Sequence, residues 1–174
     1  MTDSKDSSAY HDAVKSFAGS KLFFKIFDET IALVQKASDY LEGAGRFDQV
    51  RLESKEASVF ATESVKMTNR LMHTSSWLLA HRAFFKGDLK SPRDMNLKDY
   101  LNMNEIVSLD KLTPSLPTRF VVLVTQSNLL FERILRLDEQ LKNIQDLYDH
   151  NETKVTSATV IHDQFNRIRH EFGG

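Results

Sequence analysis

Two histidines and a tryptophan near the middle of the chain are the first candidates for chemistry. His73 and His81 share one helical face, with Trp77 between them. Two helical turns place the histidines roughly 12 Å apart at ~1.5 Å per residue, so one metal ion cannot bind both. No Glu is followed by His three positions later, the ligand pattern of di-iron bundles. We therefore expect no metal site and no cofactor, and interpret both histidines as structural or solvated, with a pH-sensitive contact as the alternative.

Residues for catalysis are also missing from the sequence. The chain has no Cys, which removes thiolate nucleophiles, thiolate metal sites and disulfides. Gly43 and Gly45 lack a third glycine and a preceding strand, so they indicate a corner and not a dinucleotide loop. Neither a phosphate loop nor a Gly-x-Ser-x-Gly elbow occurs. The carboxylates Glu53, Glu56 and Glu63 are typical of a solvated helix face. The sequence favours a protein that is not an enzyme.

A protein contact surface centred on Trp77 is the sharper hypothesis. Trp and Arg anchor interfaces, usually inside a charged rim. We predict that one helix sector forms this surface, with the residues Glu63, Lys66, Arg70, His73, Trp77, His81 and Phe84. A homodimer interface and a site for another protein both fit. The alternative is a structural Trp77, half covered by the connection that follows Gly87.

A second candidate contact lies near the end of the sequence. Ile161, Phe165, Ile168 and Phe172 recur at steps of four, three and four residues. Such a short amphipathic stretch does not hold as an isolated helix. We predict that it docks into a groove of another protein, whereas the alternatives are docking on its own bundle or a weakly sticky tail.

Three long helices are predicted to position these residues. The central helix, 47–86, contains neither Pro nor Gly and closes at Gly87. One line along it holds Phe60, Met67, Leu71, Leu78 and Phe85, and the next holds Ala57, Ala61, Val65, Thr68, Met72, Ser75, Leu79 and Ala83. Together they make an apolar arc of roughly 160°, wider than the ~100° stripe of a helix resting on one neighbour. We expect this helix to lie between two others, with the Trp77 sector exposed.

The first and third helices show regular seams. The first, at about 20–43 with Ser16 or Ser20 as its cap, has the seam Phe23, Phe27, Thr30, Val34, Ala37 and Leu41. The third, at about 116–148, has the seam Leu116, Phe120, Leu123, Ser127, Leu130, Ile134, Leu137, Leu141, Ile144 and Tyr148. Steps of three and four residues indicate helices packed nearly parallel to their partners.

The predicted fold is an all-α, antiparallel, up-down-up bundle of three helices. Residues 1–15 are expected as a flexible arm, 16–148 as the bundle domain and 149–174 as a flexible tail. A long connection, 87–115, joins the second and third helices and is expected to hold a short helix near 93–102.

Composition limits the partners and the compartment. A formal net charge of −1 gives no electrostatic case for nucleic acid or an anionic membrane surface. The longest aliphatic run, 121–124, is far below the ~20 residues that span a bilayer, so no membrane insertion is expected. The polar start, 1–8, is not a signal peptide. We expect a soluble cytoplasmic protein that forms a homodimer, because the exposed sector and residues 120–124 offer more apolar surface than three helices can cover.

A family resemblance rests on four ordered pieces of sequence. The longest piece is 60–72 (FATESVKMTNRLM) with 76–79 and 82–83. Before it in the sequence lie 17–20 with Phe23, and 40–46. After it lies 127–138, around Arg133-Ile134 and Arg136-Leu137-Asp138. The set resembles the RcdA-like family, the regulators of CtrA degradation, from about residue 17 to residue 138. The chain departs from the family pattern at Val65, Lys66, Asn69, His73 and His81.

The resemblance implies a non-enzymatic adaptor for the ATP-dependent protease ClpXP. Such an adaptor brings cell-cycle regulators, or the cargo adaptors that carry them, to the protease. One alternative is a generic helical dimerisation or scaffold module of a signalling assembly with no protease link. The other is an enzyme or ligand-binding protein, which would require a deep polar pocket between the helices.

Overall fold

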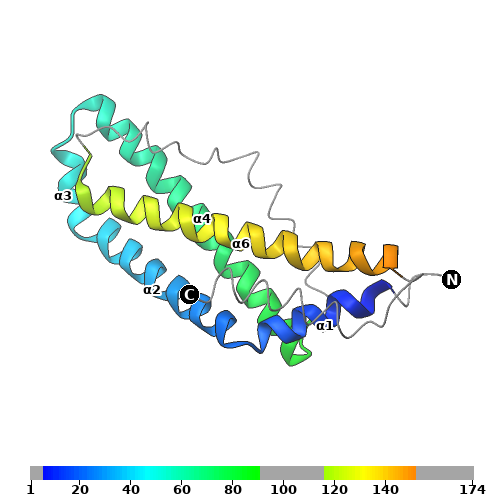
Figure 1. Cartoon of the computed structure of the whole chain (residues 1–174). Helices are drawn as coiled ribbons and strands as arrows, with labels where there is room; N and C mark the ends of the chain where they lie inside the picture. Colours follow the sequence, from blue (N-terminus) through cyan, green and yellow to red (C-terminus); the bar gives the residue numbers. More distant parts are fainter. Residues whose placement is uncertain (1–5, 91–115, 152–174) are drawn as a thin grey trace. The chain divides into compact units, whose positions relative to one another are not determined.

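The part of the chain that the structure describes is all-helical. The structure, a computed structural model, describes the backbone of residues 6–90 and 116–151, and the side chains of 10–90 and 116–143. These residues form five helices and no strand (Figure 1). The helices are α1 (Asp6–Ala18), α2 (Lys21–Glu42), α3 (Ala44–Val50), α4 (Ser54–Lys86) and α6 (Thr118–Asn151). The predicted all-α class is confirmed, and no helix in the described ranges has the length and apolarity to cross a membrane.

The described helices divide into two compact units. The first unit contains residues 6–27, 77–90 and 135–151, and the second contains 28–76 and 116–134. α2, α4 and α6 each contribute residues to both units, whereas α1 belongs to the first unit and α3 to the second. Each unit has its own apolar core, so the predicted site residues are described unit by unit.

α1 forms a helix where the sequence indicated a flexible arm up to residue 15. Its buried apolar residues recur every three or four positions: Tyr10, Ala13, Val14 and Phe17. The Phe17 ring meets the Phe23 ring edge-on at 5.5 Å and lies 5.8 Å from the ring of Trp77. The expectation of an arm is wrong for residues 6–15, because one apolar residue per turn is enough to dock a short helix on a core even when the average composition is polar.

α2 begins at a serine cap and presents a seam that the sequence placed slightly off. The Ser20 Oγ accepts a hydrogen bond from the Phe23 N–H at 3.1 Å, so one of the two predicted caps is confirmed. The buried seam is Phe23, Ile26, Thr30, Leu33, Ala37 and Tyr40. The predicted seam placed Val34 inward, but 37% of Val34 is exposed. The prediction was wrong there because the observed seam first steps three residues, from Phe23 to Ile26, whereas the predicted seam stepped four. This difference rotates the buried face about the helix axis.

The corner between α2 and α3 is packed closely around Gly45. A Cβ atom at Gly45 would lie 2.8 Å from the Tyr40 carbonyl oxygen and 3.1 Å from its ring, so only glycine fits. The Tyr40 hydroxyl donates to the Asp48 carboxylate at 2.8 Å, which ties α3 to α2. α3 then ends in a turn in which the Leu52 N–H bonds to a carbonyl three residues back. The predicted central helix is therefore broken at its start, and α4 begins only at Ser54.

α4 ends at Gly87, as predicted. Gly87 has φ 86°, in the left-handed region that glycine adopts without strain. Its N–H bonds to the Phe84 carbonyl at 3.0 Å, and the Asp88 N–H bonds to the Ala83 carbonyl at 2.9 Å. These two bonds are those of a Schellman motif, which satisfies carbonyl groups that the end of a helix leaves free.

The α6 seam is buried along its whole described length, which confirms that prediction. Its buried members are Leu116, just before the helix, and Phe120, Leu123, Ser127, Leu130, Ile134, Leu137 and Leu141. In the second unit the Phe120 ring lies 4.2 Å from the ring of Phe60 on α4 and 6.3 Å from that of Tyr40 on α2. These rings join the three helices in one core. The side chains of Ile144 and Tyr148 lie outside the described residues.

Candidate protein-docking groove

The sector predicted as an exposed contact surface lies mostly in the interior. Trp77 and His81 have no exposed surface, and Arg70 is 2% exposed. Glu63 and Phe84 are also buried, while Lys66 and His73 are half-buried. The prediction that this face is free for docking is wrong.

The reason is the spacing of the buried residues of α4. Most of them follow a seam that steps three and four alternately: Phe60, Glu63, Met67, Arg70, Thr74, Trp77, His81 and Phe84. Leu71 and Leu78, next to this seam, are buried as well. Such a seam faces neighbouring helices for its whole length. Half of its members are polar, so a search for apolar periodicity does not find it. Hydrogen bonds support part of this burial, while Nη1 and Nη2 of Arg70 and one oxygen of Glu63 have no hydrogen-bond partner in the described part of the chain.

In the first unit, Trp77 and His81 belong to a buried polar cluster. The Trp77 Nε1–H donates to one oxygen of the Asp138 carboxylate at 2.9 Å, and the Lys142 ammonium donates to the other at 2.7 Å. Asp138 is itself buried. A carboxylate that accepts both bonds satisfies its own charge and the indole N–H together. This arrangement gives Trp77 a structural role within the unit.

His81 is held neutral in the same cluster. Its Nδ1 lies 2.8 Å from the Trp77 carbonyl oxygen, so Nδ1 carries the hydrogen and donates it. Its Nε2 has no hydrogen-bond partner in the described chain, and its ring lies 3.8 Å from the ring of Trp77. Burial lowers the pKa of His81 to about 4, because the charged form would lose its hydration.

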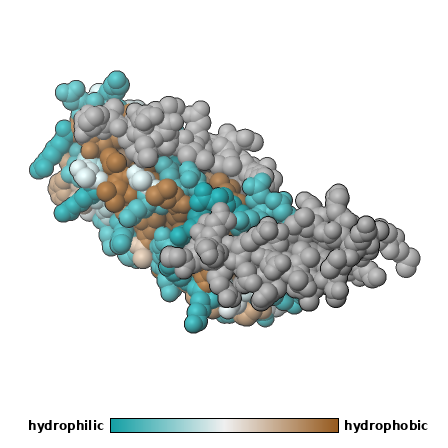
Figure 2. Space-filling view, viewed as in Figure 1, coloured by the Kyte–Doolittle hydropathy of each residue, from teal (hydrophilic) through white to brown (hydrophobic). Residues whose placement is uncertain are grey.

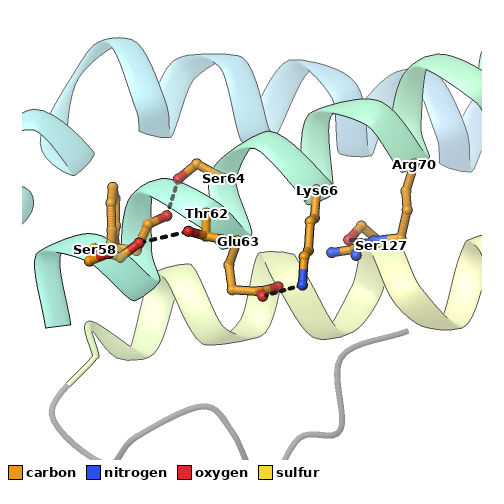
Figure 3. A network of polar contacts seen from close by, with 8 residues as sticks. Ser58, Thr62, Glu63, Ser64, Lys66, Arg70 and Ser127 are labelled. Carbon is orange, nitrogen blue, oxygen red and sulfur yellow. Dashed lines mark hydrogen bonds and ion pairs between the residues drawn. The ribbon is translucent and has the colours of Figure 1, made fainter. Parts of the chain in front are cut away.

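In the second unit, the buried polar residues of the same seam point from α4 toward α6, as Figure 3 shows. The Lys66 ammonium lies 3.3 Å from the Glu63 carboxylate, and the Arg70 Nε–H donates to the Ser127 hydroxyl at 3.3 Å. The Ser127 hydroxyl in turn donates to the Val124 carbonyl at 2.8 Å. Burial lowers the pKa of Arg70, and the nearby negative charge of Glu63 partly offsets that effect. The bond between Arg70 and Ser127 links α4 to α6 inside the unit, so Arg70 does not belong to an exposed contact surface.

No group of three or more His, Asp or Glu that could hold a metal ion occurs within the described ranges. Of the buried polar groups of α4 described above, Trp77 and Arg70 bond to α6, whereas Glu63 and His81 contact residues of α4 itself.

The exposed face of α4 includes the second of the two apolar lines that the sequence placed inward. In the first line Phe60, Met67, Leu71 and Leu78 are buried, as predicted, and only Phe85 is exposed. Val65 is 61% exposed, Met72 54% and Leu79 55%. Apolar residues also gather among hydrophilic ones on the face of the molecule that Figure 2 shows. The wide apolar arc of α4 was thus the correct signal for two faces with different roles, but the prediction assigned both to the core.

Within the second unit, α2 and α4 border a groove of about 490 Å³. Its lining residues from α2 are Val34, Ala37, Ser38, Leu41 and Glu42, and those from α4 are Thr68, Leu71, Met72 and Ser75. Ala37 and Leu71 are buried, while Val34 and Met72 are exposed. An apolar groove with exposed apolar edges is typical of a site that docks another protein.

A second groove in the same unit is more polar. It lies between α2 and α6, has a volume of about 330 Å³, and is lined by Glu29, Ala32, Leu33, Lys36, Gln126, Leu129, Leu130 and Arg133. An ion pair between Arg133 and Glu29 crosses from one helix to the other. Because charged groups occupy its surface, this groove is a weaker candidate for an apolar partner than the groove between α2 and α4.

Three other predictions fall outside the described residues. They concern the apolar residues Ile161, Phe165, Ile168 and Phe172, the connection 91–115, and the tail from 152 onward. They stay predictions.

Comparison with known proteins identifies the family. A family model described as a protein of unknown function (DUF1465) matches residues 14–172. Since this match covers most of the sequence, the chain belongs to that family of proteins. Comparison with functionally curated proteins gave no match.

One solved structure gives a more specific likeness. It is the crystal structure of RcdA from Caulobacter crescentus CB15, with 33% sequence identity and a TM-score of 0.58. The similarity covers 73% of this chain and 96% of the RcdA chain. RcdA belongs to the same family, so the resemblance inferred from the four sequence pieces is confirmed.

Proposed function

We propose that this protein is a non-enzymatic adaptor that recruits substrates, or the cargo adaptors that carry them, to the ATP-dependent protease ClpXP. The expected cargo is a class of cell-cycle regulators in the cytoplasm. The observation that supports this most is the similarity to RcdA, which includes 96% of the RcdA chain at 33% identity. The buried seam of α4, with no catalytic arrangement in the described residues, is consistent with a binding protein.

The mechanism requires contacts and no bond breaking. An adaptor that holds a substrate and a protease together raises the concentration of one near the other, so two weak contacts act as one strong attachment. The groove between α2 and α4 is one surface available for such a contact. We include in this proposal an up-down-up order of three helices and a homodimer, which would double each contact.

A reconstituted protease reaction tests the proposal. Purified ClpXP degrades a candidate cell-cycle regulator with ATP, and the rate is measured with and without the full chain. We expect the chain to accelerate degradation at low substrate concentration and to have little effect when substrate saturates the protease, because tethering lowers the apparent KM. If the rates with and without the chain are equal at every substrate concentration, the adaptor function is contradicted. That result would favour a helical dimerisation or scaffold module with no protease link.

The test includes a pair of variants matched for exposure. Met72→Glu places a charge at the edge of the groove, and Val122→Glu places one on α6, where Val122 is 47% exposed and lines neither groove. If the groove is the contact, only Met72→Glu should remove the acceleration. If both variants act like the unchanged chain, the adaptor uses another surface.

A further inference from the structure

The chemistry of the groove between α2 and α4 indicates what kind of partner fits it. Of its nine lining residues, eight are apolar or carry small hydroxyl side chains, and Glu42 is the charged one. Buried Ala37 and Leu71 form its floor, and exposed Val34 and Met72 form its edges. A partner would bury apolar surface along the middle of the groove and meet a negative charge at one end.

The hydroxyl groups that line the groove are already used. The Thr68 hydroxyl donates to the Ser64 carbonyl at 2.9 Å, and the Ser75 hydroxyl donates to the Leu71 carbonyl at 2.8 Å, both within α4. The Ser38 hydroxyl donates to the Glu42 carboxylate at 3.0 Å. Since their donors are occupied, these residues offer mainly small, weakly polar surface to a partner, so the groove selects for apolar side chains.

The length of the groove matches a helix of two to three turns. The α2 wall extends from Val34 to Glu42, about 12 Å at ~1.5 Å per residue, and the α4 wall from Thr68 to Ser75 is about 10 Å long. Walls of this length, one from each helix, accommodate side chains at positions i, i+3 or i+4, and i+7 of one helix. The small residues along both walls allow a close approach of that helix.

The charge at the end of the groove limits the partner further. One oxygen of the Glu42 carboxylate accepts the Ser38 hydroxyl, and the neighbouring Asp39 carboxylate accepts the Gln35 side-chain amide at 2.7 Å. Both acids lie on exposed parts of α2, and no positive residue lines the groove as described. A basic side chain at one end of the partner helix would complement this edge.

We propose that the groove between α2 and α4 binds an amphipathic helix of a partner protein. This helix carries apolar residues at i, i+3 or i+4, and i+7, and a Lys or Arg placed to meet Glu42. The inference extends the proposed function, since it names the chemistry of one partner of the adaptor. A second copy of this chain fits less well, because a two-fold contact would set one concave surface against another and give neither Glu42 a cation.

Peptide binding to the full chain tests this inference without a protease. The probe is a fluorescent peptide of about four helical turns, with leucines on one helical face and lysines beside them. Two comparison peptides have the same composition with the leucines scattered, or glutamate in place of lysine. Fluorescence anisotropy measures the Kd of each peptide for the unchanged chain, Met72→Glu, Val122→Glu and Glu42→Lys.

The inference makes a separate prediction for each variant. The amphipathic basic peptide should bind saturably and more tightly than both comparison peptides. Met72→Glu should weaken its binding about tenfold or more, because a charge at an apolar contact is costly to bury, while Val122→Glu should leave the Kd unchanged. Glu42→Lys should reverse the preference, so that the acidic peptide binds more tightly than the basic one.

Other outcomes would overturn the inference. Equal binding of the scattered-leucine peptide, equal effects of both glutamate variants, or no saturable binding would each remove the groove as a helix site. A self-associated mass that Met72→Glu alone reduces to a monomer would assign the groove to a second copy. These results are separable from failure of the adaptor function, since acceleration of ClpXP can persist through another surface when peptide binding fails.

Discussion

Individual residues of the α4 seam combine polarity with complete burial, and His81 shows the consequence most clearly. The ring lies against that of Trp77 and donates from Nδ1, while Nε2 is buried without a partner in the described chain. A proton on Nε2 would create a buried charge next to the Phe17 ring. Burial has the largest effect and disfavours the protonated form, and the Lys142 charge acts in the same direction; together they outweigh the bond to the Trp77 carbonyl and the Asp138 charge, which favour protonation.

The buried His81 predicts a pH-dependent stability. The pKa of His81 is about 4 in the folded chain, against an ordinary value of 6.5. Between these values the unfolded chain binds more protons, so the free energy of unfolding falls as the pH falls from 6.5 toward 4. A shift of this size is worth about 3 kcal/mol at most. Urea unfolding midpoints measured from pH 7 to pH 4.5 should show this loss.

Two histidine variants make that experiment specific. His81→Phe removes the titrating group and should flatten the pH dependence. His73→Gln is the matched control and should leave most of the pH dependence in place. His73 is only half-buried, although burial also lowers its pKa. If the pH dependence of His81→Phe equals that of the unchanged chain, the buried neutral histidine is not its source.

At the scale of the element, α4 buries a seam in which half of the residues are polar, and it leaves an apolar line exposed. The seam through Trp77 packs inside, and the line through Leu79 faces outward. A helix with a wide apolar arc can bury either side of that arc, depending on how the helix is rotated about its axis. The polar partners decide between them, since only one rotation allows the Trp77 Nε1–H to reach Asp138.

Alanine substitutions on the two faces of α4 test this rotation. Trp77→Ala should lower the free energy of unfolding by about 3–5 kcal/mol, because it removes a large buried side chain and leaves Asp138 with one bond fewer. Leu79→Ala, at a position that is 55% exposed, should change it by less than about 1 kcal/mol. Chemical denaturation measures both. A larger effect at Leu79 would mean that α4 has the opposite face buried.

At the scale of the whole molecule, exposed apolar residues occur on both units. In the second unit they include Ile31, Val65, Met72, Val122 and Leu129. The first unit exposes Phe24, Leu79 and Phe85. Surface of this kind is common at contacts between proteins, and it underlies the proposal that the chain both dimerises and binds cargo.

The proposed homodimer predicts a simple result in solution. Sedimentation equilibrium should give a mass near twice the chain mass of 20.0 kDa, and the apparent mass should fall on dilution. Met72→Glu should leave this mass unchanged, since the groove is assigned to a helix of a different protein. A monomer mass at all concentrations would contradict the homodimer but would leave the groove and its peptide test unaffected.

The sequence by itself determined the helical class, the family and several helix ends. Low Gly and Pro content, an apolar seam of steps of three and four along α6, and the glycine at the end of α4 are local signals, because each depends on neighbouring residues alone. The Ser20 cap belongs to the same group. Such features need no knowledge of what a helix packs against.

Only the tertiary structure decided which face of α4 is buried and that residues 6–18 join the first unit. Hydropathy counts Glu63, Arg70 and His81 as surface residues, although ion pairs, hydrogen bonds and ring contacts can support such residues in a core. Arg70 reaches Ser127 and Trp77 reaches Asp138 only after α4 and α6 have come together. The groove also depends on which face of α4 is buried, since the apolar face that stays outside borders α2.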